Sequence, residues 1–161
     1  MQLLDETDPF LNIPTREFDI SNPPVDFNLI VDQMIALMYE KNAIGLAANQ
    51  IGLDWRLFVM HTVSGPKVCI NPSILKSGDI QPTREGCLSF PNLSLIINRP
   101  NFILAEYFNI EMEKKTEYFD KIEAVCFQHE LDHINGITFT DRISSFQLKN
   151  ALKKRKRLKS N

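Results

Sequence analysis

The feature of this sequence that most constrains its fold is the pentapeptide His129-Glu130-Leu131-Asp132-His133. An α-helix advances about 100° per residue, so histidines four positions apart return to nearly the same face about 6 Å further along the axis. On such a helix His129 and His133 can bind one metal ion, and Glu130 can reach a water on that metal. The pattern predicts a helix that supports metal-assisted hydrolysis, with Glu130 as general base. A chance match in an ordinary helix is the alternative.

The hydrophobic periodicity around this pentapeptide predicts a mixed fold. Apolar residues recur at helical spacing over residues 25–42 and 121–135, and Gly136 is a suitable stop for the second helix. Ser144 or Ser145 can cap a last, basic helix that runs to residue 158. Residues 43–54 are expected to form a loop. Short apolar or β-branched runs separated by X-Pro pairs predict strands at 56–61, 67–70, 94–97 and 102–112.

These elements predict an α+β fold in which mostly antiparallel strands pack around a central helix that carries the metal, with an N-terminal helix and a short C-terminal helix. The length suits one domain spanning residues 1–161. Residues 1–24 contain four prolines and are expected to form an extended arm. Residues 145–161 form a basic tail on a body whose net charge of −2 argues against nonspecific nucleic-acid binding. The basic residues of this tail are Lys149, Lys153, Lys154, Arg155, Lys156, Arg157 and Lys159.

The composition also bears on location. No apolar run approaches the roughly 18 residues that a membrane-spanning helix needs, and the first eight residues lack the apolar core of a secretory signal. We therefore expect no membrane association and a cytoplasmic location. We also expect a monomer. The three cysteines are an odd number, which favours reduced thiols and metal binding over a disulfide framework.

A hydrolytic metal centre of this kind usually has three protein ligands and one open position for water. No glutamate follows Glu130, and Phe139 stands where a longer histidine motif would place its third histidine. Asp141 remains possible, although it lies only eight residues past His133. Cys87 is the better candidate, because the neighbouring glycine lets the backbone approach a metal and the thiolate is a good ligand. It belongs to the segment Glu85-Gly86-Cys87-Leu88-Ser89-Phe90-Pro91.

Three segments, in this order and at this spacing, together resemble peptide deformylase, and weaker similarity runs along nearly the whole chain. They are Gly45-Leu46-Ala47-Ala48-Asn49-Gln50, with Ala43 at the first glycine of the family pattern, then Glu85 to Ser89, and then Gln128 to His133. The resemblance implies a hydrolase that removes the formyl group from the N-formylmethionine of newly made polypeptides and releases formate. It also implies that Cys87, His129 and His133 hold one divalent metal ion. Fe(II) is the family precedent, and Zn(II), Ni(II) or Co(II) can take its place.

The same resemblance assigns roles to further residues. Glu130 would take a proton from water and deliver it to the leaving amine. The side-chain amide of Gln50 and the backbone N–H of Leu88 would meet the oxyanion. Gly45 would let the substrate backbone approach closely. We also expect substrate contacts from Glu85 and Gly86, and a slot for the methionine side chain lined by Ile44, Ile122, Val125 and Cys126.

The sequence departs from the family pattern at two positions. Asn49 stands where proline is usual, and Ser94 stands where many members have an arginine that helps hold the substrate. We expect Arg99 to form an ion pair with Glu85. We expect Asp132 either to accept a hydrogen bond from a ligand of the metal or to pair with Arg142.

Other functions remain open from the sequence alone. The chain could be another metallohydrolase, such as a peptidase, or a non-catalytic metal-binding protein. The basic tail resembles the C-terminal helix by which some deformylases dock on the ribosome, and its charge suits ribosomal RNA. An ordinary solvated helix face is the other interpretation of that tail.

Overall fold

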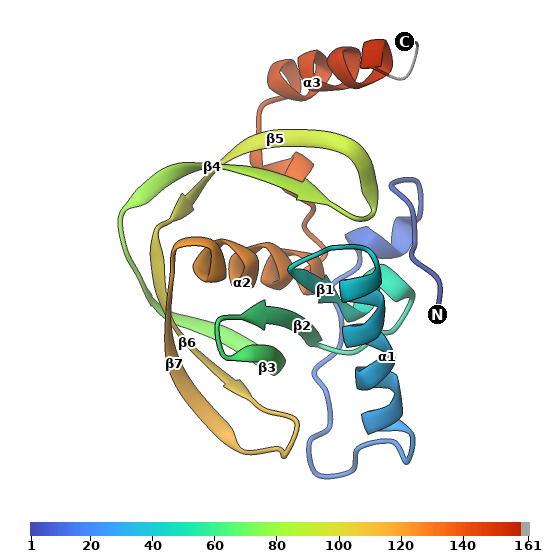
Figure 1. Cartoon of the computed structure of the whole chain (residues 1–161), viewed down its shortest axis with the longest axis vertical. Coiled ribbons are helices and arrows are strands. Elements are labelled where there is room, and N and C mark those ends of the chain that lie inside the picture. The colour runs from blue at the N-terminus through green and yellow to red at the C-terminus, as the bar shows by residue number, and fades with distance from the viewer. Residues whose placement is uncertain (159–161) are drawn as a thin grey trace.

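The structure, a computed structural model, describes residues 1–158 with three α-helices, seven strands and three short 3₁₀ turns (Figure 1). The helices are α1 (Phe27–Glu40), α2 (Lys121–Ile134) and α3 (Ser145–Leu158), and the turns are η1 (Pro9–Asn12), η2 (Ala48–Ile51) and η3 (Phe139–Arg142). Each helix begins and ends within two residues of its predicted boundary. Lys159 of the predicted basic tail and the two residues after it lie outside the described residues.

The strands form one sheet and one separate hairpin. The sheet has the order β1-β2-β3-β6-β7, with β1 (Gly45–Ala47), β2 (Leu57–Thr62), β3 (Gly65–Ser77), β6 (Phe102–Phe108) and β7 (Lys114–Asp120). The hairpin pairs β4 (Ile80–Cys87) with β5 (Phe90–Pro100). All of these pairings are antiparallel, and the predicted α+β class is confirmed.

Parts of the strand prediction are wrong. The predicted loop at 43–54 contains β1, which pairs with β2, and the 3₁₀ turn η2. The predicted strand at 102–112 ends at Phe108, because Asn109 Oδ1 accepts the backbone N–H of Glu113 at 2.8 Å and Met112 adopts a φ of 60°, which turns the chain into β7. Strands β4 and β7 were not predicted at all. Most of their residues are at least partly exposed, so their sequences carry little of the apolar pattern that marks a half-buried strand.

Helix α2 lies between the five-stranded sheet and the β4–β5 hairpin, near the centre of the molecule (Figure 1). On the sheet side, Phe127 and Ala124 of α2 pack into one apolar cluster with Phe58 and Met60 of β2. The ring centroids of Phe58 and Phe127 are 5.0 Å apart in an edge-to-face arrangement. This packing fixes the height and rotation of α2, and therefore the direction in which its polar side chains point.

On the other side of α2, strand β5 alternates between buried and exposed residues. Leu93, Leu95, Ile97 and Arg99 are buried, whereas the residues between them are exposed. Because side chains of a strand alternate between its two faces, Arg99 shares the inward face with the three apolar residues. The alternation of side chains along β5 therefore places Arg99 on the apolar face of the strand, next to α2.

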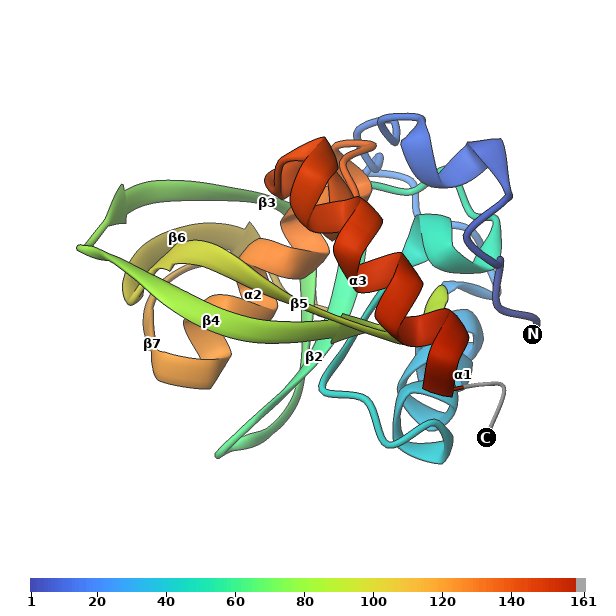
Figure 2. The ribbon, with the colours of Figure 1, turned by 90° about the horizontal axis from the view of Figure 1, so that it is seen from above.

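The two ends of the chain pack against the body of the protein and contact each other. Helix α3 lies against β5 (Figures 1 and 2), and Arg155 donates two hydrogen bonds to Glu6 at 2.8 and 2.9 Å. The N-terminal segment runs past the end of α2, where the backbone N–H of Thr15 donates to the carbonyl of Ile134 at 2.9 Å. Gly136 has a φ of 70°, and a Cβ there would lie 2.7 Å from the backbone nitrogen of Pro14, so only glycine fits this crossing. Within residues 1–158, none of the helices combines the length and hydrophobicity needed to cross a lipid bilayer.

Candidate metal centre

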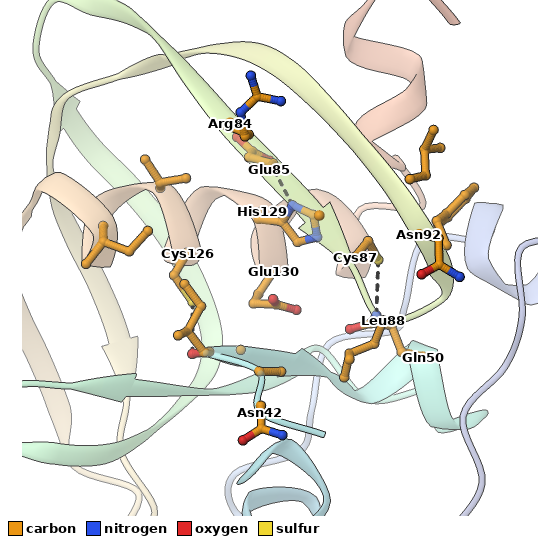
Figure 3. Close-up of a pocket in the computed structure, with 18 residues that line it drawn as sticks. Asn42, Gln50, Arg84, Glu85, Cys87, Leu88, Asn92, Cys126, His129 and Glu130 are labelled. Carbon is orange, nitrogen blue, oxygen red and sulfur yellow. Dashed lines mark hydrogen bonds and ion pairs between the residues drawn. The ribbon is translucent and has the colours of Figure 1, made fainter. Parts of the chain in front are cut away.

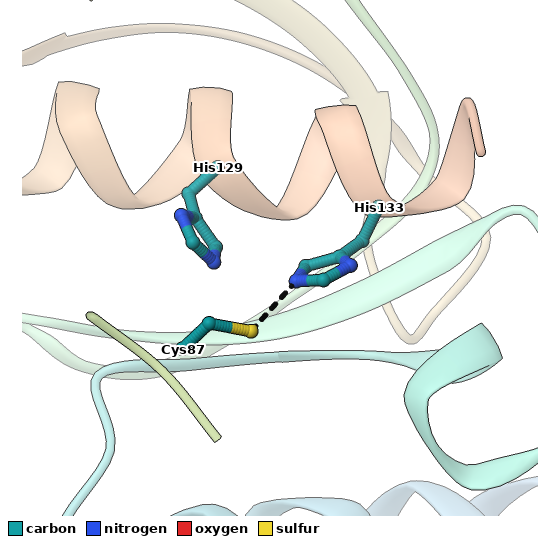
Figure 4. Close-up of side chains that lie close together, drawn as sticks. All are labelled: Cys87, His129 and His133. Carbon is teal, nitrogen blue, oxygen red and sulfur yellow. Dashed lines mark hydrogen bonds between the residues drawn. The ribbon is translucent and has the colours of Figure 1, made fainter. Parts of the chain in front are cut away.

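Three side chains from two elements converge at the centre of the molecule. Cys87 ends β4, and His129 and His133 lie one helical turn apart on α2 (Figure 4). Their possible ligand atoms all lie within 4.8 Å of one another, and Cys87 Sγ is 3.1 Å from His133 Nε2. The helical spacing predicted for the histidines and the choice of Cys87 as the third group are both reproduced.

The alternative ligand Asp141 is engaged elsewhere. Its carboxylate accepts the backbone N–H of Thr138 at 2.8 Å and the hydroxyl of the same residue at 2.9 Å, which caps η3. The remaining histidine, His61, lies on the surface and is hydrogen-bonded to Tyr39. Within the described part of the chain, the Cys87 cluster is the one group of acidic, histidine and cysteine side chains that could hold a metal ion.

His129 is oriented by a carboxylate. Its Nδ1 is 2.9 Å from Glu85 Oε2, which leaves Nε2 on the side of Cys87 and His133. A carboxylate behind a ligand histidine fixes the tautomer and orientation of the ring. Glu85 and Cys87 both lie on β4 and both reach α2, Glu85 at His129 and Cys87 at His133. The strand therefore supplies both a ligand candidate and the group that orients another one.

A buried ion-pair network supports this carboxylate. Arg99 Nε and Nη2 donate to the two oxygens of Glu85 at 2.7 and 3.0 Å, which confirms the predicted ion pair. Arg99 Nη1 also donates to Asp132 at 2.6 Å, and Asp132 in turn pairs with Arg142. The predicted pairing of Asp132 with Arg142 is thus confirmed. Burial raises the pKa of Glu85, but hydrogen bonds from His129 and Arg99 outweigh it and lower this pKa to about 2.

The two ligand histidines differ in protonation. Burial and the neighbouring His129 lower the pKa of His133 well below its usual value, so this ring is neutral and available as a ligand. Burial also lowers the pKa of His129, but its hydrogen bonds with Cys87 and Glu85 outweigh that effect and raise the pKa to about 10. Metal binding at the cluster is expected to release protons, because thiols and imidazole nitrogens bind a metal ion only in their deprotonated form.

Glu130 lies beside the cluster in a confined position. The residue is 4% exposed, and one of its oxygens, Oε2, has no hydrogen-bond partner within residues 1–158. Burial is the main cause that raises the pKa of Glu130, to about 7. A Cβ atom on Gly45 would lie 2.4 Å from Glu130 Oε1, so the glycine is required for the backbone of β1 to pass the carboxylate. A buried carboxyl with a free oxygen and a pKa near neutrality suits proton transfer.

Gln50 is held with its amide nitrogen toward the sulfur ligand. Its Oε1 accepts the backbone N–H of Ala47 at 2.9 Å, which fixes the amide plane. Its Nε2 then lies 3.5 Å from Cys87 Sγ and 3.3 Å from Ser89 Oγ. Leu88, which follows the cysteine, is half-buried and lines the same cavity.

The cluster opens into a cavity of about 360 Å³ between β1, the β4–β5 hairpin and α2 (Figure 3). Every residue predicted for the site lines it except His133, which is buried. Val125 and Cys126 are buried, whereas Ile44 and Ile122 are more than 40% exposed and lie at the rim. Residues that line the cavity without having been singled out for it are Asn42, Ala43, Arg84, Phe90, Asn92 and Leu93. The last three belong to the start of β5, whose position beside α2 has no local sequence pattern that could have revealed it.

The donor set fits a divalent metal ion. One thiol and two imidazoles are ligands that zinc and similar first-row ions accept, and three protein groups leave a position for water. Glu130, whose Oε2 has no hydrogen-bond partner within residues 1–158, lines the same cavity. A helix with this histidine pair, a third ligand from a strand and an adjacent carboxylate defines a mononuclear metallohydrolase site.

Comparison with known proteins identifies the kind of hydrolase. The sequence model of the polypeptide deformylase family matches residues 1–149. The peptide deformylase of Thermotoga petrophila is 42% identical over 115 residues, covering 71% of this chain and 70% of that protein. The peptide deformylase of Aquifex aeolicus is 38% identical over 156 residues, covering 92% and 90%. A crystal structure of a peptide deformylase from Synechococcus elongatus in complex with actinonin has a TM-score of 0.88 at 34% identity, covering 96% of this chain and 85% of that one.

The chain belongs to the polypeptide deformylase family. Its activity is that of the family, the hydrolytic removal of the formyl group from an N-terminal formylmethionine, and the prediction made from the sequence is confirmed. The cluster of Cys87, His129 and His133 fits a single metal ion.

Proposed function

We propose that the residues of the cavity divide the deformylation reaction among them. Cys87, His129 and His133 hold one divalent ion, which when bound acts as a Lewis acid and makes water nucleophilic near neutral pH. The observation that carries this proposal is the meeting of these three side chains within 4.8 Å, beside a buried carboxylate oxygen that has no partner in the described chain. We propose Fe(II) as the native ion, with Zn(II), Ni(II) or Co(II) as substitutes.

Glu130 moves the proton in this scheme. A pKa of about 7 lets its carboxylate take a proton from water and return it, as carboxylic acid, to the leaving amine. Gln50 Nε2 and the backbone N–H of Leu88 stabilise the oxyanion that forms on the formyl oxygen when water attacks the formyl carbon. Support for Gln50 comes from the hydrogen bond to Ala47, which keeps the amide from rotating away from Cys87. Losing one donor of this kind costs about 10²- to 10³-fold in rate.

The substrate methionine occupies the apolar part of the cavity. Val125 and Cys126 form its buried wall, and Ile44 and Ile122 close over it at the rim. The substrate backbone lies along β1 near Gly45. This strand ends the sheet order, so its second edge is open to an extended peptide in the manner of an added strand. Gly86 and the backbone of Glu85 face the peptide from the hairpin side, while the Glu85 carboxylate holds His129.

We also propose that α3 is the ribosome contact. Its last turns carry Lys153, Lys154 and Lys156, and the Arg155–Glu6 pair ties the helix to the body of the protein. A cluster of cations on one helix suits the phosphate backbone of RNA, and binding through it weakens as salt rises. Residues 1–161 act as one domain and a monomer. We propose that the protein works in the cytoplasm, where formylated chains leave the ribosome.

The deciding experiment measures formate released from a formyl-Met peptide by protein purified anaerobically with Fe(II) or Ni(II). Acetyl-Met and unmodified peptides are assayed side by side, and cleavage of an internal peptide bond would instead indicate a peptidase. Glu130→Gln is expected to lower turnover by about 10²- to 10⁴-fold with the metal retained. Glu123→Gln is the matched control, because Glu123 lies on the same helix and accepts the backbone N–H of Val63. Unchanged turnover in Glu130→Gln would contradict the proposed proton transfer.

A further inference from the structure

Asn49 joins the turn that carries Gln50 to the end of the metal-carrying helix. It lies in η2 and is fully buried. Its Nδ2 donates to the backbone carbonyl of His133 at 2.6 Å, across 84 residues of sequence. The last carbonyls of a helix have no partner in the helix itself, so this bond adds a restraint at the last turn of α2. Gly136 N donates to the same carbonyl at 2.9 Å.

The remaining polar atoms of the Asn49 and His133 side chains show how His133 is held. Asn49 Oδ1 and His133 Nδ1 are both buried, and neither has a hydrogen-bond partner within the part of the chain that the structure describes. His133 Nε2 faces Cys87 Sγ, so a ring that ligates through Nε2 carries its hydrogen on Nδ1. His129 differs, because its Nδ1 is engaged by the Glu85 carboxylate. Asn49 is thus the polar side chain that holds His133, and it does so through the backbone.

One short turn therefore contacts two of the three ligand residues. Gln50 places Nε2 3.5 Å from Cys87 Sγ, and Asn49, its neighbour, bonds to the carbonyl of His133. The turn η2 thus contacts the residues on both sides of the 3.1 Å separation between Cys87 Sγ and His133 Nε2. The geometry links the position of the turn to the shape of the metal site.

We propose that Asn49 is a positioning residue for the metal ligand His133. By fixing the last turn of α2, it keeps His133 Nε2 at ligand distance from the ion shared with Cys87, and so slows the loss of that ion. This inference rests on the proposed role of Cys87, His129 and His133 as metal ligands. Residues that support a metal ligand from behind typically contribute about 10- to 100-fold to metal affinity.

The test compares two substitutions of Asn49 with one of Thr15. Asn49→Leu has similar size and removes both polar atoms, and Asn49→Asp keeps the shape but loses the donor. Thr15→Val is the matched control, because Thr15 Oγ1 donates at 3.0 Å to the carbonyl of Ile134, the residue next to His133. Each protein is loaded with Co(II), and its visible spectrum and its Co(II) affinity in competition with a chelator are measured. The thermal unfolding of each metal-free protein is recorded beside them.

Both Asn49 variants are expected to bind Co(II) about 10- to 100-fold more weakly and to show altered ligand-field bands. Thr15→Val is expected to unfold at a lower temperature with Co(II) affinity within a factor of two of the parent protein. If the Asn49 variants lose thermal stability but keep the parent affinity and spectrum, the role of Asn49 is only structural and the inference is wrong. If the parent protein shows no sulfur-to-Co(II) charge-transfer band, the proposed ligand set is wrong. Failure of the Asn49 inference can therefore be distinguished from failure of the proposed ligand set.

Discussion

The buried guanidinium of Arg99 is expected to be the largest single electrostatic contribution to the stability of the site. Arg99 is 3% exposed, and the two carboxylates that it neutralises, Glu85 and Asp132, are 6% and 5% exposed. Arg99→Met preserves most of the side-chain length but leaves both carboxylates without this partner. Removing one member of a buried ion pair typically costs about 3–5 kcal/mol, because the other charge stays buried.

The structure narrows the expected loss of stability for Arg99→Met. Asp132 still pairs with Arg142 after the substitution, and Glu85 keeps its hydrogen bonds with His129 and with the hydroxyl of Thr83. We therefore expect the lower end, about 3 kcal/mol. For a chain of this length, 1 kcal/mol corresponds to roughly 2–4 °C, so the unfolding midpoint should fall by roughly 6–12 °C.

Arg142→Met is the matched control, since Arg142 binds the same Asp132 but its side chain is 43% exposed. An exposed pair is worth at most about 1 kcal/mol. Both variants are unfolded in urea as metal-free protein and compared at constant m value. The reasoning is refuted if the two variants lose the same free energy of unfolding. Adding Glu85→Gln to Arg99→Met should recover part of the loss, because it removes the charge that was left unpaired.

Three further predictions concern the site itself. Gly45→Ala would place Cβ 2.4 Å from Glu130 Oε1 and 2.7 Å from Cys126 Sγ. Formate release should therefore fall by at least about 10²-fold, while the far-ultraviolet circular dichroism stays that of the parent protein. Normal turnover would mean that the carboxylate moves aside without consequence. The pKa of Glu85, about 2 against its ordinary 4.5, stabilises the folded state fully above pH 4.5, and this contribution is lost as the pH falls toward 2. The urea midpoint should fall as the pH is lowered through this range. In Glu85→Gln the urea midpoint should depend less on pH. Cys87→Ser should lower the bound metal measured by elemental analysis, whereas metal content equal to that of the parent would exclude the sulfur as a ligand.

The local sequence pattern was sufficient to predict the features that lie within a single helix. The spacing of His129 and His133 required an α-helix, and α2 carries them one turn apart on the side that faces Cys87. The apolar stripes of α1 and α2 likewise predicted both helices to within two residues. These features follow from the 3.6-residue period, which is a property of consecutive residues.

Pairing between distant segments was much harder to predict. Strand β4 has few apolar residues, so nothing local marked it as a strand, yet it delivers both Cys87 and Glu85 to α2. The branching of Arg99 to two carboxylates was also only half predicted, because the Glu85 pair was expected and the Asp132 bond was not. Both depend on the β4–β5 hairpin lying along one side of α2.

The sequence by itself therefore determined the chemistry that is available: two imidazoles on one helical face, a carboxylate beside them, and a thiol in a glycine-containing segment. Only the tertiary structure decided that this thiol, 46 residues before His133, reaches the imidazoles while Asp141 does not. The physical reason is the range of the interactions. A helix is specified by hydrogen bonds between residues four apart, whereas the meeting of β4 with α2 depends on the summed packing of a sheet, a hairpin and their apolar clusters.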